Sequence, residues 1–132
     1  MGQLIADIFY KQRADFEQQN VTRNDRFVFP EDVQIETDIP YIEDGQAVHR
    51  LDVLYPKQRT QEKLPVIVNV HGGGLLMGSK EFNLYFCSLF SRMGYLVFNV
   101  EYRLVPDCRL YDQIDDILAA VQYIQGQLLT YH

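Results

Sequence analysis

The fold is decided by one stretch of the chain, Pro65-Val66-Ile67-Val68-Asn69-Val70-His71-Gly72-Gly73-Gly74, which continues as Leu75-Leu76-Met77-Gly78-Ser79-Lys80. Its first six residues form a nearly continuous β-branched run, which is typical of a strand covered on both faces. The glycines that follow let the backbone turn sharply, and free N–H groups ahead of a helix attract negative charge. The stretch therefore predicts a buried strand that ends in an anion-binding turn.

The residues after this turn alternate between helix and strand. A buried helix is predicted over 82–93, a second covered strand over 95–100, and a last helix over 112–129. Gly94 supplies the stop of the first helix, whose apolar side chains recur at helical spacing: Phe82, Tyr85, Phe86, Leu89, Phe90 and Met93. Such alternation indicates a parallel sheet with helices on both faces.

The residues before the turn predict a helix and an antiparallel pair. Residues 3–19 read as an amphipathic helix, and 20–32 as a polar connector. Apolar and polar residues alternate over 33–39 and 49–55, which indicates two antiparallel strands near the edge of a sheet. We therefore expect a single domain, with a helix and connector at 1–32 and the sheet with its core helices at 33–129.

Composition limits the classes of protein that fit. The chain has 132 residues, is 47% apolar, and carries 12 Lys and Arg against 18 Asp and Glu, a net charge of −6. These values fit one folded core and argue against a disordered chain or a nucleic-acid partner. No apolar run approaches the roughly 20 residues of a membrane span. With only Cys87 and Cys108 and no secretory signal, we expect a cytoplasmic protein with reduced thiols.

The glycine cluster has three interpretations, of which the first is a phosphate loop. Gly73 and Gly78 have the spacing of such a loop, but Ser79 and Lys80 stand in the reverse of the required order. The reversal moves the ammonium and the hydroxyl away from their phosphate and Mg²⁺ positions. This arrangement disfavours a phosphate loop.

The second interpretation is a dinucleotide site. Gly72, Gly74 and Gly78 resemble a variant glycine fingerprint, and Glu101 closes the next strand where an acid would meet a ribose hydroxyl. The last glycine comes one residue late, however, and the antiparallel pair ahead of the motif has no place in a fold that opens with the nucleotide strand. Glu101 is instead expected to be part of an ion pair or a loop brace.

The third interpretation is an oxyanion hole, and it is supported by a resemblance to a known family. His71-Gly72-Gly73-Gly74 after a strand is similar to the HGGG-type motif of α/β-hydrolase lipases and esterases. Residues 51–56 look like the second strand of that family, and residues 101–107 look like the "YRLAPE" segment of its hormone-sensitive-lipase-like group. The resemblance covers residues 33–128 in unbroken order. It implies the amino-terminal half of an α/β-hydrolase fold, with a mostly parallel sheet, an antiparallel edge pair and flanking helices.

The resemblance also implies a role for each residue of the motif. Gly73 and Gly74 would direct their backbone N–H groups at the oxyanion, Gly72 would make room for the turn, and His71 would brace the loop. Rigid N–H donors of this kind stabilise the tetrahedral transition state, and losing one costs a factor of about 10²–10³ in rate. The substrate would be a small-molecule carboxylic ester. Leu75 departs from the family, whose members often have an aromatic residue there, so we expect a differently shaped pocket beside the loop.

The nucleophile of that chemistry is missing from the chain. A serine mechanism needs a Gly-x-Ser-x-Gly elbow, a catalytic acid and a histidine. None of Ser79, Ser88 and Ser91 lies in such an elbow. The chain as given is therefore expected to be inactive alone. The alternative functions are a non-catalytic half-domain that associates with itself or a partner and, third, a dinucleotide-binding half-domain.

Two further expectations concern ligands and partners. Asp112, Asp115 and Asp116 cluster at the start of the last helix without His or Cys nearby, as partners of the helix dipole do, so neither a metal nor a cofactor is predicted. In the family's strand order, the strand at 65–70 becomes an edge when the following strand is absent. Because this edge is apolar and uncharged, we expect a homo-oligomer that forms through it.

Overall fold

The computed structural model of the chain describes residues 1–131, with the side chains of residues 21–24 excepted. Four strands form one sheet in the order β1-β2-β4-β3. The strands are β1 (Val33–Pro40), β2 (Arg50–Pro56), β3 (Val66–Val70) and β4 (Leu96–Val100). β3 and β4 are parallel, whereas β2 is antiparallel to both of its neighbours, so the sheet is mixed.

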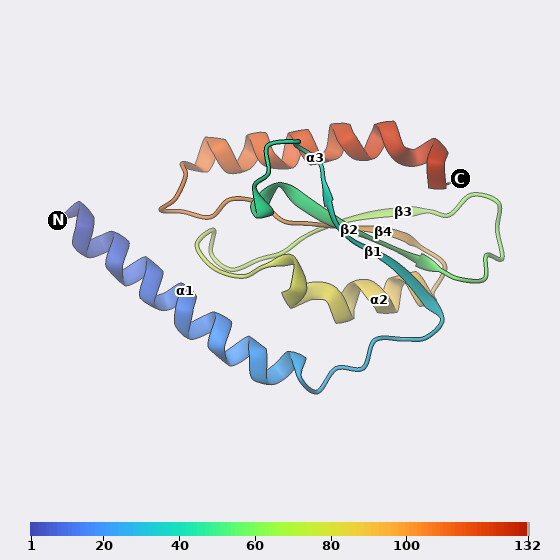
Figure 1. Ribbon diagram of the computed structural model, residues 1–132, viewed down its shortest axis with the longest axis horizontal. Helices are drawn as coiled ribbons and strands as arrows, with labels where there is room; N and C mark the ends of the chain where they lie inside the picture. Colours follow the sequence, from blue (N-terminus) through green and yellow to red (C-terminus); the bar gives the residue numbers. More distant parts are fainter. Residues whose placement is uncertain (132) are drawn as a thin grey trace.

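Helices lie on both sides of this sheet (Figure 1). α3 (Leu110–Tyr131) covers one face, and α2 (Leu84–Arg92), preceded by the short helix η2 (Lys80–Asn83), covers the other. α1 (Gly2–Asn24) lies on the side of α2, and a second short helix, η1 (Ala47–His49), precedes β2. The predicted α/β class and the predicted order of helices and strands are confirmed.

The core has two layers that meet at β4, which is buried along its whole length. On the side of α3, Leu96, Phe98 and Val100 pack with Ala120 and Ile124. On the side of α2, Val97 packs with Val33, Leu54 and Cys87. Alternate residues of one strand thus serve both layers, as period-2 geometry requires.

The buried face of α2 differs from the predicted one. Tyr85, Phe86, Leu89 and Met93, expected in the core, are all exposed in the described chain. The buried residues are the smaller Cys87, Ser88 and Ser91. These small side chains let α2 lie close to β2 and β4, while the aromatic side chains of Tyr85 and Phe86 stay exposed. Burial raises the pKa of the Cys87 thiol to about 12, so it stays protonated in the core.

The predicted apolar side of the amino-terminal helix contacts the body of the protein only in part. Leu4, Ile5 and Ile8 of that side are exposed, whereas the ring of Phe16, on the same side, lies 5.3 Å from that of Phe82. Arg13, expected on the polar side, also contacts the body, through the Leu76 carbonyl oxygen. No helix of the described residues is both long and apolar enough to cross a membrane.

Candidate active site

The glycine motif forms the turn between β3 and η2, at the carboxyl end of β3. Gly73, Gly74 and Gly78 all have positive φ angles, of 138°, 61° and 95°. A Cβ atom at Gly73 would lie 1.9 Å from the Met77 carbonyl oxygen, and one at Gly78 would lie 2.6 Å from that of Gly72. Gly73 and Gly78 therefore have to be glycine for the loop to close in this form.

Gly72 differs from the other glycines of the loop. It was expected to make room for the turn, but a Cβ atom added there meets nothing within 4 Å. The geometry thus gives no steric reason for glycine at this position. The next non-glycine residue, Leu75, has a φ of 69°, which side chains rarely adopt. The three consecutive residues 73–75 therefore all have positive φ angles, which most residues avoid.

The carbonyl groups of the loop are fixed from three sides. The Gly73 oxygen accepts hydrogen bonds from the N–H groups of Leu76 and Met77. The Leu75 oxygen accepts from the Val105 N–H at 3.0 Å and from Gln113 Nε2 at 2.8 Å. The Leu76 oxygen accepts from Arg13 Nε of α1 at 2.9 Å.

The amide groups at the tip of the loop remain free. Within residues 1–131, no hydrogen bond uses the backbone N–H of Gly73 or Gly74. A loop with fixed carbonyls and unpaired N–H donors is preorganised to bind an anion, because the donors do not have to reorient. The arrangement can therefore stabilise a negatively charged oxygen at the end of β3.

His71 is held beneath the loop by both ring nitrogens. Its side chain is buried, with Nδ1 2.9 Å from the Gly72 carbonyl oxygen and Nε2 2.7 Å from Glu101 Oε1. Its ring stacks on Tyr102 at 4.5 Å, and the Tyr102 hydroxyl donates to the His71 carbonyl oxygen at 2.6 Å. Because both nitrogens face oxygen acceptors, neither is positioned to take a proton from a nucleophile. This geometry favours the expected bracing role.

Glu101 connects the two ends of the loop. One carboxylate oxygen faces His71 Nε2, and the other accepts the Lys80 backbone N–H at 3.1 Å. The carboxylate is thereby engaged within the protein. It is not free to bind a ribose hydroxyl, which disfavours the dinucleotide interpretation.

Lys80 is likewise engaged within the protein. Its ammonium lies 2.9 Å from Asp38 Oδ1, 2.9 Å from Asp52 Oδ1 and 2.8 Å from Glu81 Oε1. Burial alone would lower the pKa of Lys80, but the hydrogen bonds that it donates to these carboxylates more than offset burial and raise it. A buried ammonium neutralised by carboxylates cannot bind a phosphate, so the phosphate-loop interpretation has no support.

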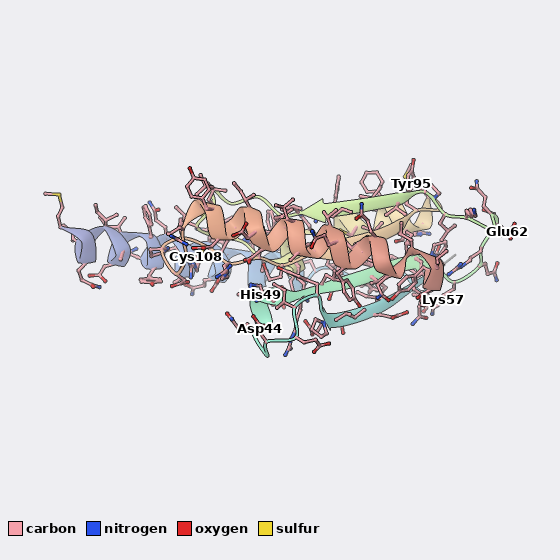
Figure 2. The ribbon with its side chains drawn as sticks, turned by 90° about the horizontal axis from the view of Figure 1, so that it is seen from above. Asp44, His49, Lys57, Glu62, Tyr95 and Cys108 are labelled. Carbon is pink, nitrogen blue, oxygen red and sulfur yellow. The ribbon has the colours of Figure 1, made fainter. Side chains whose placement is uncertain are left out.

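A second buried network anchors the loop that follows β4. His49 lies with Nδ1 2.5 Å from Asp44 and Nε2 3.0 Å from Asp116, and Figure 2 shows His49 and Asp44 together. Arg103 Nη2 donates to the same Asp116 at 2.7 Å. Burial would raise the pKa of Asp116, but the hydrogen bonds from Arg103 lower it overall. Asp116 is thus a buried anchor between α3 and this loop, which goes beyond the helix-dipole role expected for it.

The structure assigns no nucleophile to the site. Ser88 and Ser91 are fully buried in α2, and Ser88 Oγ donates to the Tyr85 carbonyl oxygen. Within the described part of the chain, no serine hydrogen-bonds a histidine. No group of three or more His, Cys, Asp or Glu side chains in residues 1–131 is placed to hold a metal ion. The site therefore consists of backbone donors and the residues that support them.

The supporting role of Tyr102 can be measured directly. Tyr102→Phe leaves the buried His71 carbonyl without its donor, so we expect the free energy of unfolding to fall by about 1–3 kcal/mol in urea denaturation. Tyr111→Phe is the matched control, because Tyr111 is 74% exposed and its hydroxyl has no buried partner to lose. Equal stabilities for the two variants would contradict a bracing role for the hydroxyl.

Comparison with known proteins identifies the relatives of this arrangement. Residues 51–132 match the BD-FAE family. Carboxylesterase 20 of Arabidopsis thaliana is 36% identical over 69 residues, which are 50% of this chain and 21% of that protein. Tuliposide A-converting enzyme 2 of Tulipa gesneriana is 35% identical over 66 residues, 48% of this chain and 17% of that protein. The matched segments thus span about a fifth of the length of these relatives.

Solved structures agree with this relationship. Esterase B from Lactobacillus rhamnosis superposes with a TM-score of 0.81 and 28% identity, over 93% of this chain and 40% of that one. An esterase of the bacterial hormone-sensitive lipase family has the same fold, with a TM-score of 0.64 and 22% identity over 80% of this chain and 33% of that one. The chain belongs to the BD-FAE family, and it folds as the amino-terminal part of an α/β-hydrolase of the hormone-sensitive-lipase-like type.

Proposed function

We propose that residues 71–78 form the oxyanion hole of a carboxylic ester hydrolase, with the N–H groups of Gly73 and Gly74 as donors. The observation that carries the proposal is that these two amides are unpaired in the described chain while the carbonyls of Gly73, Leu75 and Leu76 are fixed. Attack on an ester turns its carbonyl oxygen into an anion. Two fixed donors stabilise that anion more than the neutral substrate, which lowers the barrier.

The supports of the loop have a defined place in this chemistry. Glu101 and Tyr102 hold His71, and Arg13 holds Leu76, so the loop does not relax when charge develops at the ester oxygen. The donors therefore lose no binding energy to reorganisation. In this proposal these side chains are positioning residues, and only the backbone of Gly73 and Gly74 touches the reacting atoms.

The bond-making groups are proposed to come from outside this segment. No serine of the chain lies in a Gly-x-Ser-x-Gly sequence, and the two serines of α2 are buried. The chain alone is then inactive toward esters, and the complete site acts on small-molecule carboxylic esters. The relatives named as esterases and carboxylesterases support this reaction class. The unpaired Cys87 and Cys108 support a reducing, cytoplasmic location.

A fusion protein tests the proposal. The chain is joined to the carboxy-terminal part of esterase B from Lactobacillus rhamnosis, starting where the structural alignment ends. We expect the fusion to hydrolyse p-nitrophenyl butyrate, and the 132-residue chain to stay at the buffer rate. A control fusion carries alanine in place of any Gly-x-Ser-x-Gly serine of the added part. Ester hydrolysis by the chain alone would contradict the proposal that the nucleophile comes from outside this segment. If a folded, active fusion keeps its rate when both Gly73 and Gly74 are replaced with alanine, the proposal of an oxyanion hole is overturned.

A further inference from the structure

Two asparagines interrupt the apolar runs of the parallel pair of strands. Asn69 lies in β3 and Asn99 in β4, and the two residues are register partners in strands that run side by side (Figure 1). Asparagine is depleted in strands, and burial of its amide is costly unless the amide is hydrogen-bonded. Asn99 is fully buried and Asn69 is half-buried. The pair therefore needs partners inside the protein.

A row of side-chain amides leads from these strands to the far end of the glycine loop. Asn99 Nδ2 donates to the Lys80 carbonyl oxygen at 2.7 Å, and Asn69 Nδ2 donates to Asn99 Oδ1 at 2.8 Å. Asn83 Nδ2 lies 3.4 Å from Asn69 Oδ1. Although Asn83 stands at the N-cap of α2, its side chain makes no capping hydrogen bond. We call these three residues, Asn69, Asn83 and Asn99, the asparagine row.

The Lys80 carbonyl determines the direction of the amides in the asparagine row. A carbonyl oxygen only accepts hydrogen bonds, so the NH₂ group of Asn99 must face it and the Asn99 oxygen must face Asn69. Asn69 must then present its own NH₂ group to Asn99. Turning one of these amides over would place two oxygens against each other. The orientation of Asn69 is thus coupled to the hydrogen bond that Asn99 donates to Lys80.

Lys80 is also where the asparagine row meets the hydrogen-bond network of His71. The Lys80 N–H donates to Glu101 Oε2 at 3.1 Å, and Glu101 Oε1 lies 2.7 Å from His71 Nε2. His71 Nδ1 in turn lies 2.9 Å from the Gly72 carbonyl oxygen. Both backbone groups of Lys80 are therefore held, the N–H by Glu101 and the carbonyl by Asn99. The loop that carries the free amides thus begins and ends at fixed backbone groups.

We propose that Asn99 and Asn69 are positioning residues of the oxyanion hole. By holding the Lys80 carbonyl they fix one end of the loop, and through it the direction of the Gly73 and Gly74 amides. A displacement of about 1 Å at such a site can cost on the order of 10² in rate. The inference rests on the proposed function, because the direction of these amides matters to a reaction only if they are its donors. Neither asparagine is required to touch the reacting atoms.

Glycine amide signals in nuclear magnetic resonance spectra report the geometry of the loop directly. The chain has eight glycines, so isotope labelling of glycine alone gives few signals to assign. The signals of Gly73 and Gly74 report the two proposed donors. Spectra of the 132-residue chain do not depend on ester hydrolysis. Three glycines outside the loop serve as internal references: Gly45, Gly94 and Gly126.

Asn69→Asp tests the coupling along the asparagine row. The introduced carboxylate accepts but cannot donate, so Asn99 is expected to turn its NH₂ group toward position 69 and away from Lys80. The Gly73 and Gly74 signals should then move, and the reference signals should not. Asn69→Ala is the matched control, because it introduces no competing acceptor and should move the loop signals less. Equal changes in the two variants, or none in either, would overturn the proposal.

Asn99→Ala removes the donor to Lys80 itself and should move the same two glycine signals. Its control is Val97→Ala, because Val97 is equally buried on the same face of β4 but belongs to the apolar layer against α2. Both variants lose core contacts and stability, whereas only Asn99→Ala should move the loop signals. A folded Asn99→Ala variant whose loop signals stay in place would overturn the proposal. If that variant does not fold, Asn69→Asp, at a half-buried position, decides.

The fusion with esterase B tests the consequence for catalysis. Asn69→Asp should lower kcat for p-nitrophenyl butyrate by about tenfold and leave KM within about twofold, since a misdirected donor weakens binding of the transition state and not of the ester. Asn69→Ala should keep the parent rate within about threefold. Moved glycine signals with an unchanged kcat would overturn the positioning role. An inactive parent fusion would instead contradict the proposed function, and the glycine signals of the chain would still test the asparagine row.

Discussion

Replacing Lys80 with methionine is expected to lower the free energy of unfolding by about 3–5 kcal/mol. Methionine fills the space of the side chain but leaves Asp52, which is 2% exposed, without the ammonium 2.9 Å away. The backbone N–H of Asp38 still donates to Asp52 at 3.0 Å, but it carries no full charge. A buried carboxylate without a cation is strongly destabilising. Urea denaturation followed by circular dichroism measures the loss.

The pH dependence of the Lys80 variant separates a charge effect from poor packing. Burial raises the pKa of Asp52 and outweighs the opposing effect of Lys80, so removing Lys80 raises it further. A carboxyl whose pKa is raised on folding favours the folded state at low pH, and that contribution is lost as pH rises through the folded-state pKa. The deficit of the variant is therefore largest at neutral pH and shrinks toward pH 3.8, the ordinary value for this carboxyl.

Two further variants complete this experiment. Lys11→Met removes an exposed pair, with Lys11 and Asp15 side chains 77% and 55% exposed, so it should leave the urea midpoint unchanged. Combining Lys80→Met with Asp52→Asn should restore most of the loss, because the amide oxygen still accepts the Asp38 N–H and no charge is buried. A deficit that is independent of pH, or no recovery in the double variant, would contradict the charge explanation.

The sequence was sufficient to predict the elements and their order, because periodicity reports where strands and helices lie. It was not sufficient to predict which face of α2 is buried. In α2 the apolar stripe containing Phe86 and Met93 is exposed, and the polar Ser88 and Ser91 lie against the sheet. A hydrophobic stripe indicates only that some partner could cover it. In α3, Ile114 and Leu118 belong to such a stripe and are exposed in this chain.

One part of the candidate site can be recognised from neighbouring residues in the sequence, and the other part depends on contacts between distant segments. The glycines of the loop could be found from the sequence because they are consecutive and follow a strand. His71 and Glu101 could also be expected as braces, whereas the supports that come from distant segments could not. Arg13 reaches Leu76 from α1, and Lys80 joins Asp38 and Asp52 across η2, β1 and β2. No spacing rule links such positions, since their contact depends on how the elements pack.

Gly73→Ala is expected to lower kcat/KM of the fusion with esterase B by about 10²–10³. The added Cβ would lie 1.9 Å from the Met77 carbonyl oxygen, so the loop has to shift at the residue that carries one of the two proposed donors. Gly73 also has a φ of 138°, a conformation that alanine rarely adopts. The loss should appear in kcat with p-nitrophenyl butyrate, because the oxyanion exists only after attack on the ester has begun.

The neighbouring glycines make this prediction specific to donor geometry. Gly72→Ala meets no atom within 4 Å, so its rate should stay within about threefold of the parent. Gly74→Ala has free space but keeps a φ of 61°, so strain of about 1–2 kcal/mol should give an intermediate loss. The loss of rate is thus expected to increase from the Gly72 variant through the Gly74 variant to the Gly73 variant. This order follows backbone strain and steric collision rather than position in the chain. Equal losses at all three positions would indicate general damage to the loop, and a Gly73 variant that keeps the rate of the parent would show that the Gly73 amide does not face the reacting oxygen.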